Sequence, residues 1–257
     1  MAALRLAAIA LTGCLAEPSP PSCPATRPLT ELDTPAEDMS PWMSEDRRWI
    51  LFHRFDRTTN KSIVFEARRN SATDAFDTVV PVTQGIDLDF DPVGSEDGNT
   101  VWYVEGDGTL GDNILAVQRK PDGTFGPPMQ AFAELGPVLH PRFTRDQLTI
   151  VYGYPAGVAI ATRPDLATPF TTEVATLGNA REPTITADGA TVYFQAAVDP
   201  PYMLQQADRS GTGFTNVHPV VIDGLDDAGW PSIQSDGKTL LVSALTGTSL
   251  DVWIVCE

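Results

Sequence analysis

Polar and aromatic side chains precede five prolines that recur along the chain, each within four residues of its proline. They are Asp38, Asp91, His140, Arg181, Glu182, Asp227 and Trp230. Two such carboxylates can act as acid and base in glycoside hydrolysis when they lie roughly 5 to 10 Å apart. The same side chains can instead cap turns or bond to neighbouring backbone. No spacing singles out an acid–base pair, so the set is interpreted as a candidate ligand-binding group without a catalytic residue.

Metal chemistry is not indicated by spacing. The three histidines, His53, His140 and His218, are far apart in the sequence, and no two have the short spacing of a typical ligand pair. The stretch DLDFDP alternates carboxylates like the start of a calcium loop but lacks the glycine and the distal glutamate of that loop. A Gly-x-Ser-x-Gly nucleophile motif is also missing. The sequence therefore predicts no metal and no cofactor.

The five prolines open a repeated skeleton of Pro, four residues, Asp and an apolar run. The copies are PWMSEDRRWILF, PVGSEDGNTVWY, PRFTRDQLTIVY, PTITADGATVYF and PSIQSDGKTLLV. Their aspartates are Asp46, Asp97, Asp146, Asp188 and Asp236, which makes the spacings 51, 49, 42 and 48 residues. This period matches one four-stranded propeller blade per repeat.

The remainder of each period supports an all-β unit. A second strand such as TVYFQA is followed by a third such as SIVFEAR and by an outer segment with a Phe, as in GTGFTNVHPVVI. The 22 prolines and 20 glycines would break most helices long enough to pack. Aromatic residues in the second strands are expected in the core. Arg47 and Gln147 replace the glycine after the repeat Asp, so these two turns are expected to differ in geometry from the others.

The Pro, Ser/Thr, Asp-Gly and Gly-x-Phe pattern resembles the TolB-type, WD-repeat-like β-propeller repeats of bacterial envelope proteins. The resemblance covers residues 28–257 and implies a five-bladed β-propeller, with repeats starting near 41, 92, 141, 183 and 231. In such propellers the strand that begins at the repeat proline is innermost, so the seven candidate residues would surround one mouth of the central channel. Blades of this kind occur in binding proteins and in enzymes, so the fold does not settle the activity.

The ring needs a closing strand, because the fifth repeat ends after its third strand, DVWIVCE. We expect the N-terminal segment Pro28 to Leu32 to dock as the outer strand of the last blade and to cover its open edge. Cys256 ends the third strand, and Cys23 lies just before the borrowed strand. A disulfide between Cys23 and Cys256 is therefore predicted, with Cα atoms within about 7 Å.

The N-terminus has the features of an export signal. Residues 1–13 read as a lipoprotein signal peptide with lipid attachment at Cys14, and an ordinary secretory signal is the alternative. Residues 14–27 are rich in Pro and Ser and are expected to form a tether. The apolar run is too short to span a bilayer. We expect a protein of the cell envelope that is attached only by lipid, on the periplasmic face of the outer membrane or on the cell surface.

The net charge of the chain limits the classes of partner that it can bind. The chain has 17 Lys and Arg against 34 Asp and Glu, a formal net charge of −17, which disfavours nucleic acid because phosphate binding needs a basic face. The sequence predicts a non-catalytic propeller that serves as a scaffold for an envelope protein or a small ligand. The alternative is a carbohydrate-active propeller, a lectin or a glycoside hydrolase, that uses the carboxylates at the channel mouth.

Overall fold

The computed structural model describes residues 23, 25–84, 88–106, 113–154, 157–173, 177–178, 180–196, 201–211 and 213–256. The predicted signal peptide, Cys14 and most of the tether lie outside these residues. The described residues form strands and one short 3-10 helix, η1 (Ala133–Leu135), which confirms the all-β prediction. None of the helical structure among them is long and apolar enough to cross a membrane.

Each repeat supplies strands in chain order. The first has β2 (Glu37–Met43), β3 (Trp49–Asp56), β4 (Lys61–Arg68) and β5 (Asp77–Pro81). The second has β6 (Leu88–Gly94), β7 (Thr100–Gly106), β8 (Asn113–Gln118) and β9 (Met129–Gln130). The third has β10 (Leu139–Phe143), β11 (Thr149–Tyr154), β12 (Gly157–Thr162) and β13 (Thr171–Glu173). The fourth has β14 (Arg181–Ile185), β15 (Thr191–Gln195), β16 (Leu204–Ser210) and β17 (Gly213–Pro219), and the fifth has β18 (Ala228–Ile233), β19 (Thr239–Thr246) and β20 (Ser249–Cys256).

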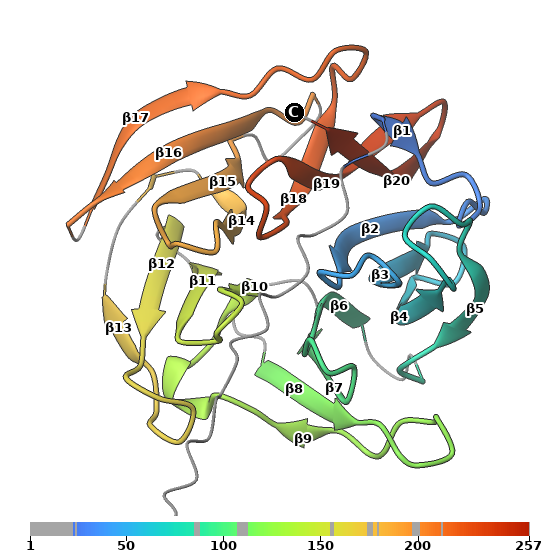
Figure 1. Cartoon of the computed structure of the whole chain (residues 1–257), viewed down its shortest axis with the longest axis horizontal. Coiled ribbons are helices and arrows are strands. Elements are labelled where there is room, and N and C mark those ends of the chain that lie inside the picture. The colour runs from blue at the N-terminus through green and yellow to red at the C-terminus, as the bar shows by residue number, and fades with distance from the viewer. Residues whose placement is uncertain are drawn as a thin grey trace, which may run out of the picture.

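The sheets are arranged around a centre (Figure 1). The third and fourth repeats each form a four-stranded antiparallel sheet, and the first two are joined in one sheet through a single parallel pair, Ser62 with Leu88. The strand that carries the repeat proline is the innermost of each sheet. These inner strands contact one another in chain order, β2 to β6, β10, β14 and β18, and β18 contacts β2.

The N-terminal segment completes the sheet of the fifth repeat. Strand β1 (Arg27–Pro28) pairs antiparallel with β20, and Leu29 N donates to Val252 O at 2.8 Å. The paired segment is shorter than expected, because the chain turns after Leu29 and buries Leu32 in the core. Cys23 and Cys256 form the expected disulfide, with a Cα–Cα distance of 5.6 Å.

Five apolar clusters lie between neighbouring repeats and pack them together. Val151 and Phe194, for example, belong to one cluster shared by the third and fourth repeats, while Phe52 and Leu241 join the first repeat to the fifth. The second-strand aromatic residues are buried as predicted. They are Trp49, Phe52, Trp102, Tyr103, Tyr152, Tyr193 and Phe194. Burial of these side chains holds adjacent sheets face to face.

The turn after each inner strand is built around the repeat Asp. In four repeats a Ser or Thr hydroxyl donates to the Asp two residues later, as Ser44 does to Asp46 at 2.7 Å. The expectation that the Arg47 and Gln147 turns differ was wrong. Both residues have φ of 57°, in the same left-handed region as Gly98 at 72°. The same backbone hydrogen bond closes all five turns, so the turn imposes this conformation whichever residue occupies the position.

Candidate functional site

The residue directly before each repeat proline lies at a bulge of the inner strand. These residues are Ser40, Asp91, His140, Glu182 and Trp230, with φ between 50° and 53°. At each bulge the residue and its proline face one residue of the neighbouring strand, so the pairing register shifts there. Non-glycine residues seldom adopt this conformation, and such strain often marks functional positions. Five repeats therefore place one side chain each at equivalent points.

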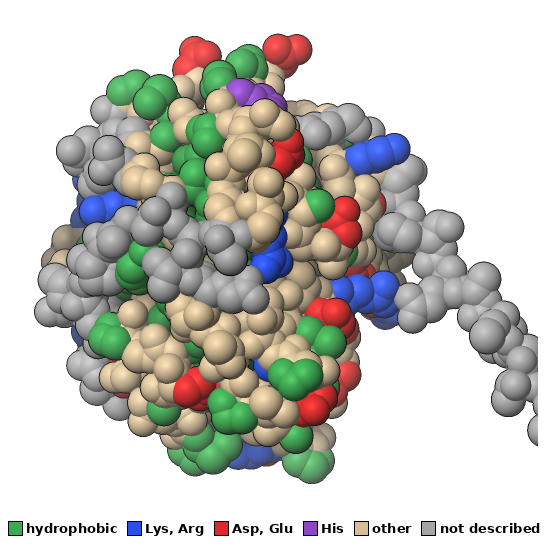
Figure 2. Space-filling view, turned by 90° about the vertical axis from the view of Figure 1, so that its left-hand side faces the viewer, with side chains coloured by type: hydrophobic (Ala, Val, Ile, Leu, Met, Phe, Trp, Pro, Cys, Tyr) green, Lys and Arg blue, Asp and Glu red, His purple; other side chains and the backbone are tan. Residues whose placement is uncertain are grey.

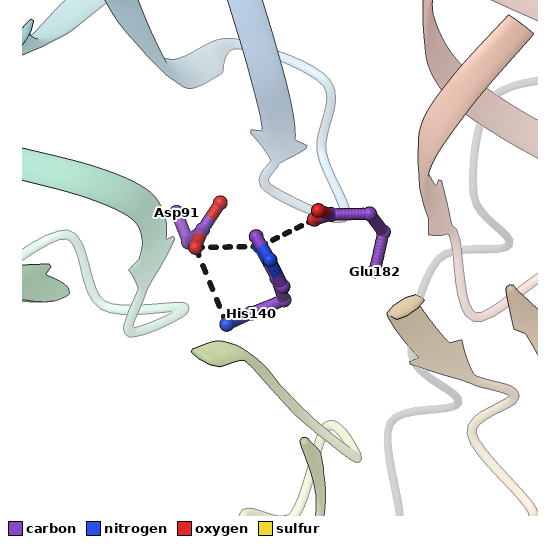
Figure 3. A group of neighbouring side chains, drawn as sticks. All are labelled: Asp91, His140 and Glu182. Atoms are coloured by element: carbon purple, nitrogen blue, oxygen red, sulfur yellow. Dashed lines mark hydrogen bonds and ion pairs between the residues drawn. The ribbon is translucent and has the colours of Figure 1, made fainter. Parts of the chain in front are cut away.

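Four of these five residues contact each other in chain order. Ser40 Oγ donates to Asp91 Oδ1 at 2.6 Å, and the backbone N of His140 donates to Asp91 Oδ2 at 3.2 Å. His140 Nδ1 lies 2.6 Å from Asp91 Oδ2 and also contacts Glu182 Oε2. Figure 3 shows the imidazole between the two carboxylates. The side chains of Asp91 and Glu182 are almost fully buried.

Burial and charge act against each other in this cluster. Burial alone would lower the pKa of His140, but Asp91 and Glu182 raise it to about 10. Burial would raise the pKa of Asp91, yet the positive charges of His140 and Arg142 hold it below its ordinary value. Burial dominates at Glu182 and raises the pKa of that carboxyl. The cluster is therefore stable when a positive charge lies between the two acids.

Two further basic side chains support the cluster. Arg142 is buried and donates to Ser40 O at 3.4 Å, and its charge favours the ionised forms of Asp91 and Glu182. His53 Nδ1 accepts from the backbone N of Asp91 at 3.4 Å, and burial lowers the pKa of His53 to about 4. His53 is therefore a neutral acceptor that orients the Asp91 backbone.

The other predicted site residues do not join the cluster. Asp38 is buried and accepts two hydrogen bonds from Arg54, at 2.6 and 3.0 Å. Asp227 accepts from the backbone N of Tyr202 at 2.7 Å, and Arg181 is exposed. Asp38 and Asp227 therefore stabilise local structure and Arg181 faces solvent, because none of the three occupies the bulge position.

Trp230 occupies the fifth bulge but takes another partner. Its ring is partly exposed and meets the Tyr202 ring edge to face, with centroids 4.9 Å apart. It is the aromatic member of the set of bulge residues, and within the described part of the chain no hydrogen bond or ion pair links it to the other four. The sequence reasoning missed Ser40, Arg142 and His53. The sequence contains a signal for Ser40, since this residue directly precedes its repeat proline, as Asp91 and His140 do.

The cluster is also a candidate metal centre, which the sequence analysis did not predict. One nitrogen of His140 and one carboxylate oxygen each of Asp91 and Glu182 lie within 4.8 Å of one another. Histidine spacing along the chain could not show this, because each ligand comes from a different repeat. As an acid–base pair the carboxylates are poorly placed, because the His140 ring lies between them where a substrate would have to bind.

Solved structures share the fold. A candidate TolB of Agrobacterium tumefaciens aligns with a TM-score of 0.55 and 14% identity, over 88% of this chain and 79% of that chain. A luciferin-regenerating enzyme aligns with a TM-score of 0.50 and 8% identity, over 91% of this chain and 95% of that chain. TolB of Acinetobacter baumannii aligns with a TM-score of 0.49 and 14% identity, over 81% of this chain but only 50% of that chain.

The strand arrangement and the likeness to the Agrobacterium structure define a TolB-like β-propeller fold, which confirms the resemblance noted in the sequence as to fold. At such identities the likeness concerns the fold alone, and the neighbours include a protein named as an enzyme. No protein-family model matches the chain, and no curated protein matches it either. The activity must therefore be argued from the site.

Proposed function

We propose that the chain is a five-bladed propeller that acts in the cell envelope as a non-catalytic binding module for a protein or a small ligand. Five equivalent bulges and five inner strands support the blade number. The contact between β18 and β2 and the pairing of β1 with β20 support closure of the last blade by the N-terminal strand. A rigid closed scaffold of this kind presents loops at its faces for binding.

The observation that carries the non-catalytic assignment is the position of His140 between Asp91 and Glu182. The imidazole contacts both carboxylates, so it fills the space that a glycosidic bond would need. Both acids are also buried, and Asp91 accepts a hydrogen bond from Ser40. The cluster therefore works as a structural connection between blades.

Binding is assigned to the channel mouth beside Trp230. Its ring stays partly exposed, and aromatic side chains of this kind often anchor a partner. Figure 2 shows the side of the molecule rather than the channel mouth, and acidic and basic side chains are interspersed on that side. The formal net charge of −17 agrees with a partner other than nucleic acid.

Envelope location rests on two features. The disulfide between Cys23 and Cys256 fits an oxidising compartment. The lipid on Cys14 rests on the sequence, since Cys14 lies outside the described residues. Replacing Cys14 with Ser should abolish incorporation of radiolabelled palmitate, and continued incorporation would exclude the lipid anchor.

The carbohydrate-active alternative has one observation in its favour. The environment shifts the pKa of Asp91 down and that of Glu182 up, as in acid–base pairs of glycosidases, and Trp230 stands on the same ring of bulges. An open substrate position between the acids would be needed as well. The close contacts of His140 argue against it.

One experiment separates these functions. The purified chain is incubated with envelope extract and, separately, with a panel of plant and bacterial oligosaccharides. We expect no cleavage of any sugar and a protein or small ligand that is retained by the wild type and lost by Trp230→Ala. Trp253→Ala is the matched control, because Trp253 is a partly exposed Trp on β20, away from the bulges. Sugar hydrolysis that Glu182→Gln abolishes would overturn the proposal, and so would equal retention by Trp230→Ala.

A further inference from the structure

We propose that Asp91, His140 and Glu182 bind one divalent transition-metal cation, of the Zn²⁺ or Mn²⁺ class, which fastens three consecutive inner strands. The ligands come from β6, β10 and β14, one from each strand. The ion would have a structural role and does not depend on the binding function proposed above. The proposal goes beyond that function, because it assigns a metal ion to the inner strands and not a partner to the channel mouth.

The three donor groups converge on one point. The ligand atoms lie within 4.8 Å of one another, and His140 Nδ1 is 2.6 Å from Asp91 Oδ2. Bonds of about 2.0 to 2.2 Å to a tetrahedral ion place ligand atoms about 3.4 Å apart. Side-chain movements of roughly an ångström therefore convert the cluster into a coordination site. The backbone is already set by the three bulges.

His140 Nδ1 is the independent indication of a ligand. It is fully buried and lies close to a carboxylate oxygen on each side, but it makes no hydrogen bond of ordinary geometry. A ring nitrogen carries at most one hydrogen, so it cannot serve both acids well. A cation at the centre would satisfy the nitrogen and both carboxylates together. Buried polar atoms that lack partners are costly, and ions are one recognised remedy.

The surroundings have the features of an outer coordination shell. Ser40 Oγ holds Asp91 Oδ1 at 2.6 Å, which leaves Oδ2 turned toward His140. Hydrogen bonds of this kind orient metal ligands. Arg142 contributes one positive charge, so the four groups sum to zero while His140 carries its proton and to −1 once the imidazole has released it. A bound divalent cation would take the place of that proton as the positive charge between the two carboxylates.

The donor set selects the class of metal. One imidazole nitrogen with two carboxylates suits Zn²⁺, Mn²⁺ or Fe²⁺. Calcium and magnesium prefer six or more oxygen ligands, which three side chains with one nitrogen do not provide. Zn²⁺ is therefore the first probe, and Co²⁺ is its spectroscopic substitute.

The test uses the full chain without a polyhistidine tag, stripped with chelator and reloaded. We expect about one Zn²⁺ per chain by mass spectrometry of the metal, and visible Co²⁺ absorption of a low-coordinate site. His140→Gln and Glu182→Gln should weaken Zn²⁺ binding by more than about 100-fold, and Ser40→Ala by roughly 10- to 100-fold. His218→Gln is the matched control, because His218 is exposed on β17 and should leave binding unchanged.

Clear outcomes would overturn the site. Reloaded wild type with far less than one ion per chain and no Co²⁺ absorption excludes it, and this arm needs no variant to fold. Binding that survives His140→Gln but disappears in His218→Gln would assign the metal to the surface. Neither result bears on whether Trp230 binds a partner, so failure here is distinguishable from failure of the proposed function.

Discussion

Two positions recur in every repeat, the Asp turn and the bulge before the proline, and they are used differently. At the turn both the residue types and the contacts repeat, since a Ser or Thr bonds the Asp in four copies. At the bulge only the backbone repeats, while Ser, Asp, His, Glu and Trp occupy it. The turn depends on a hydrogen bond of its Asp side chain and therefore requires that residue. The bulge depends on the backbone alone and leaves its side chain available for a site.

The two regions also differ in the reach of their contacts. Ser95 and Asp97 are two residues apart, whereas Ser40 and Asp91 are 51 residues apart in different repeats. Loss of the Ser–Asp contact within a turn therefore affects one hairpin, whereas other turn contacts, such as that of Glu45 N with Glu96, join repeats. Loss of a contact between bulge residues affects the association of sheets, so substitutions at the bulges should have larger effects on global stability.

The largest effect is expected at the ring. His140→Leu would leave Asp91 and Glu182 buried without their cation and should lower the free energy of unfolding by about 3 to 5 kcal/mol. Urea denaturation at neutral pH measures it. His218→Leu, an exposed histidine on β17, should change stability by less than about 0.5 kcal/mol. Equal losses in the two variants would erase the distinction between ring and surface.

A smaller loss is expected at a turn. Asp97 accepts from Ser95 Oγ at 2.5 Å and from the backbone N of Asn99 at 3.0 Å. Asp97→Ala should cost about 1 to 2 kcal/mol in the same denaturation experiment. Asp97→Asn retains one acceptor oxygen and should cost less. If Asp97→Ala were as damaging as His140→Leu, the turns would carry more of the fold than their local contacts indicate.

A gain is expected where a turn lacks glycine. Gln147 has φ of 57°, a conformation that glycine adopts without steric cost. Gln147→Gly should raise stability by about 0.5 kcal/mol, the relief of strain less the added chain entropy. Gly98→Ala, the converse change at φ of 72°, should lower stability by about 1 kcal/mol. Thermal unfolding of both variants checks the opposite signs.

The smallest effect concerns pH at the turns. Burial raises the pKa of Glu96 to about 7, although Glu45 N donates to its carboxylate at 3.1 Å. A raised pKa means that the stability from this group is full below pH 4.5 and is lost as pH rises through about 7. Glu96→Gln should flatten the decline in melting temperature between these values. The side chain is exposed, so the change should be about a degree, within the range of weak surface effects. An unchanged slope would contradict the shifted pKa.

Much of the candidate site was predictable from register. Asp91, His140, Glu182 and Trp230 could be chosen because each precedes a repeat proline. Asp38, Arg181 and Asp227 also lie close before a repeat proline in the sequence, but they lie away from the bulge, where a shift of one or more residues changes the face or the depth of a side chain. Ser40 does not stand out in the sequence, because a lone serine carries little chemical signal.

The repeat period, the all-β class and the Asp turns follow from the amino-acid sequence alone, as do the two cysteines that join the ends of the chain, because these features depend on local backbone preference and on regular spacing. That Asp91, His140 and Glu182 meet at one point depends on the tertiary fold. They are separated by whole repeats, so their distance depends on how the sheets are disposed around the centre. The pKa shifts and the candidate metal centre follow from that meeting, since burial and neighbouring charge exist only once the repeats have assembled.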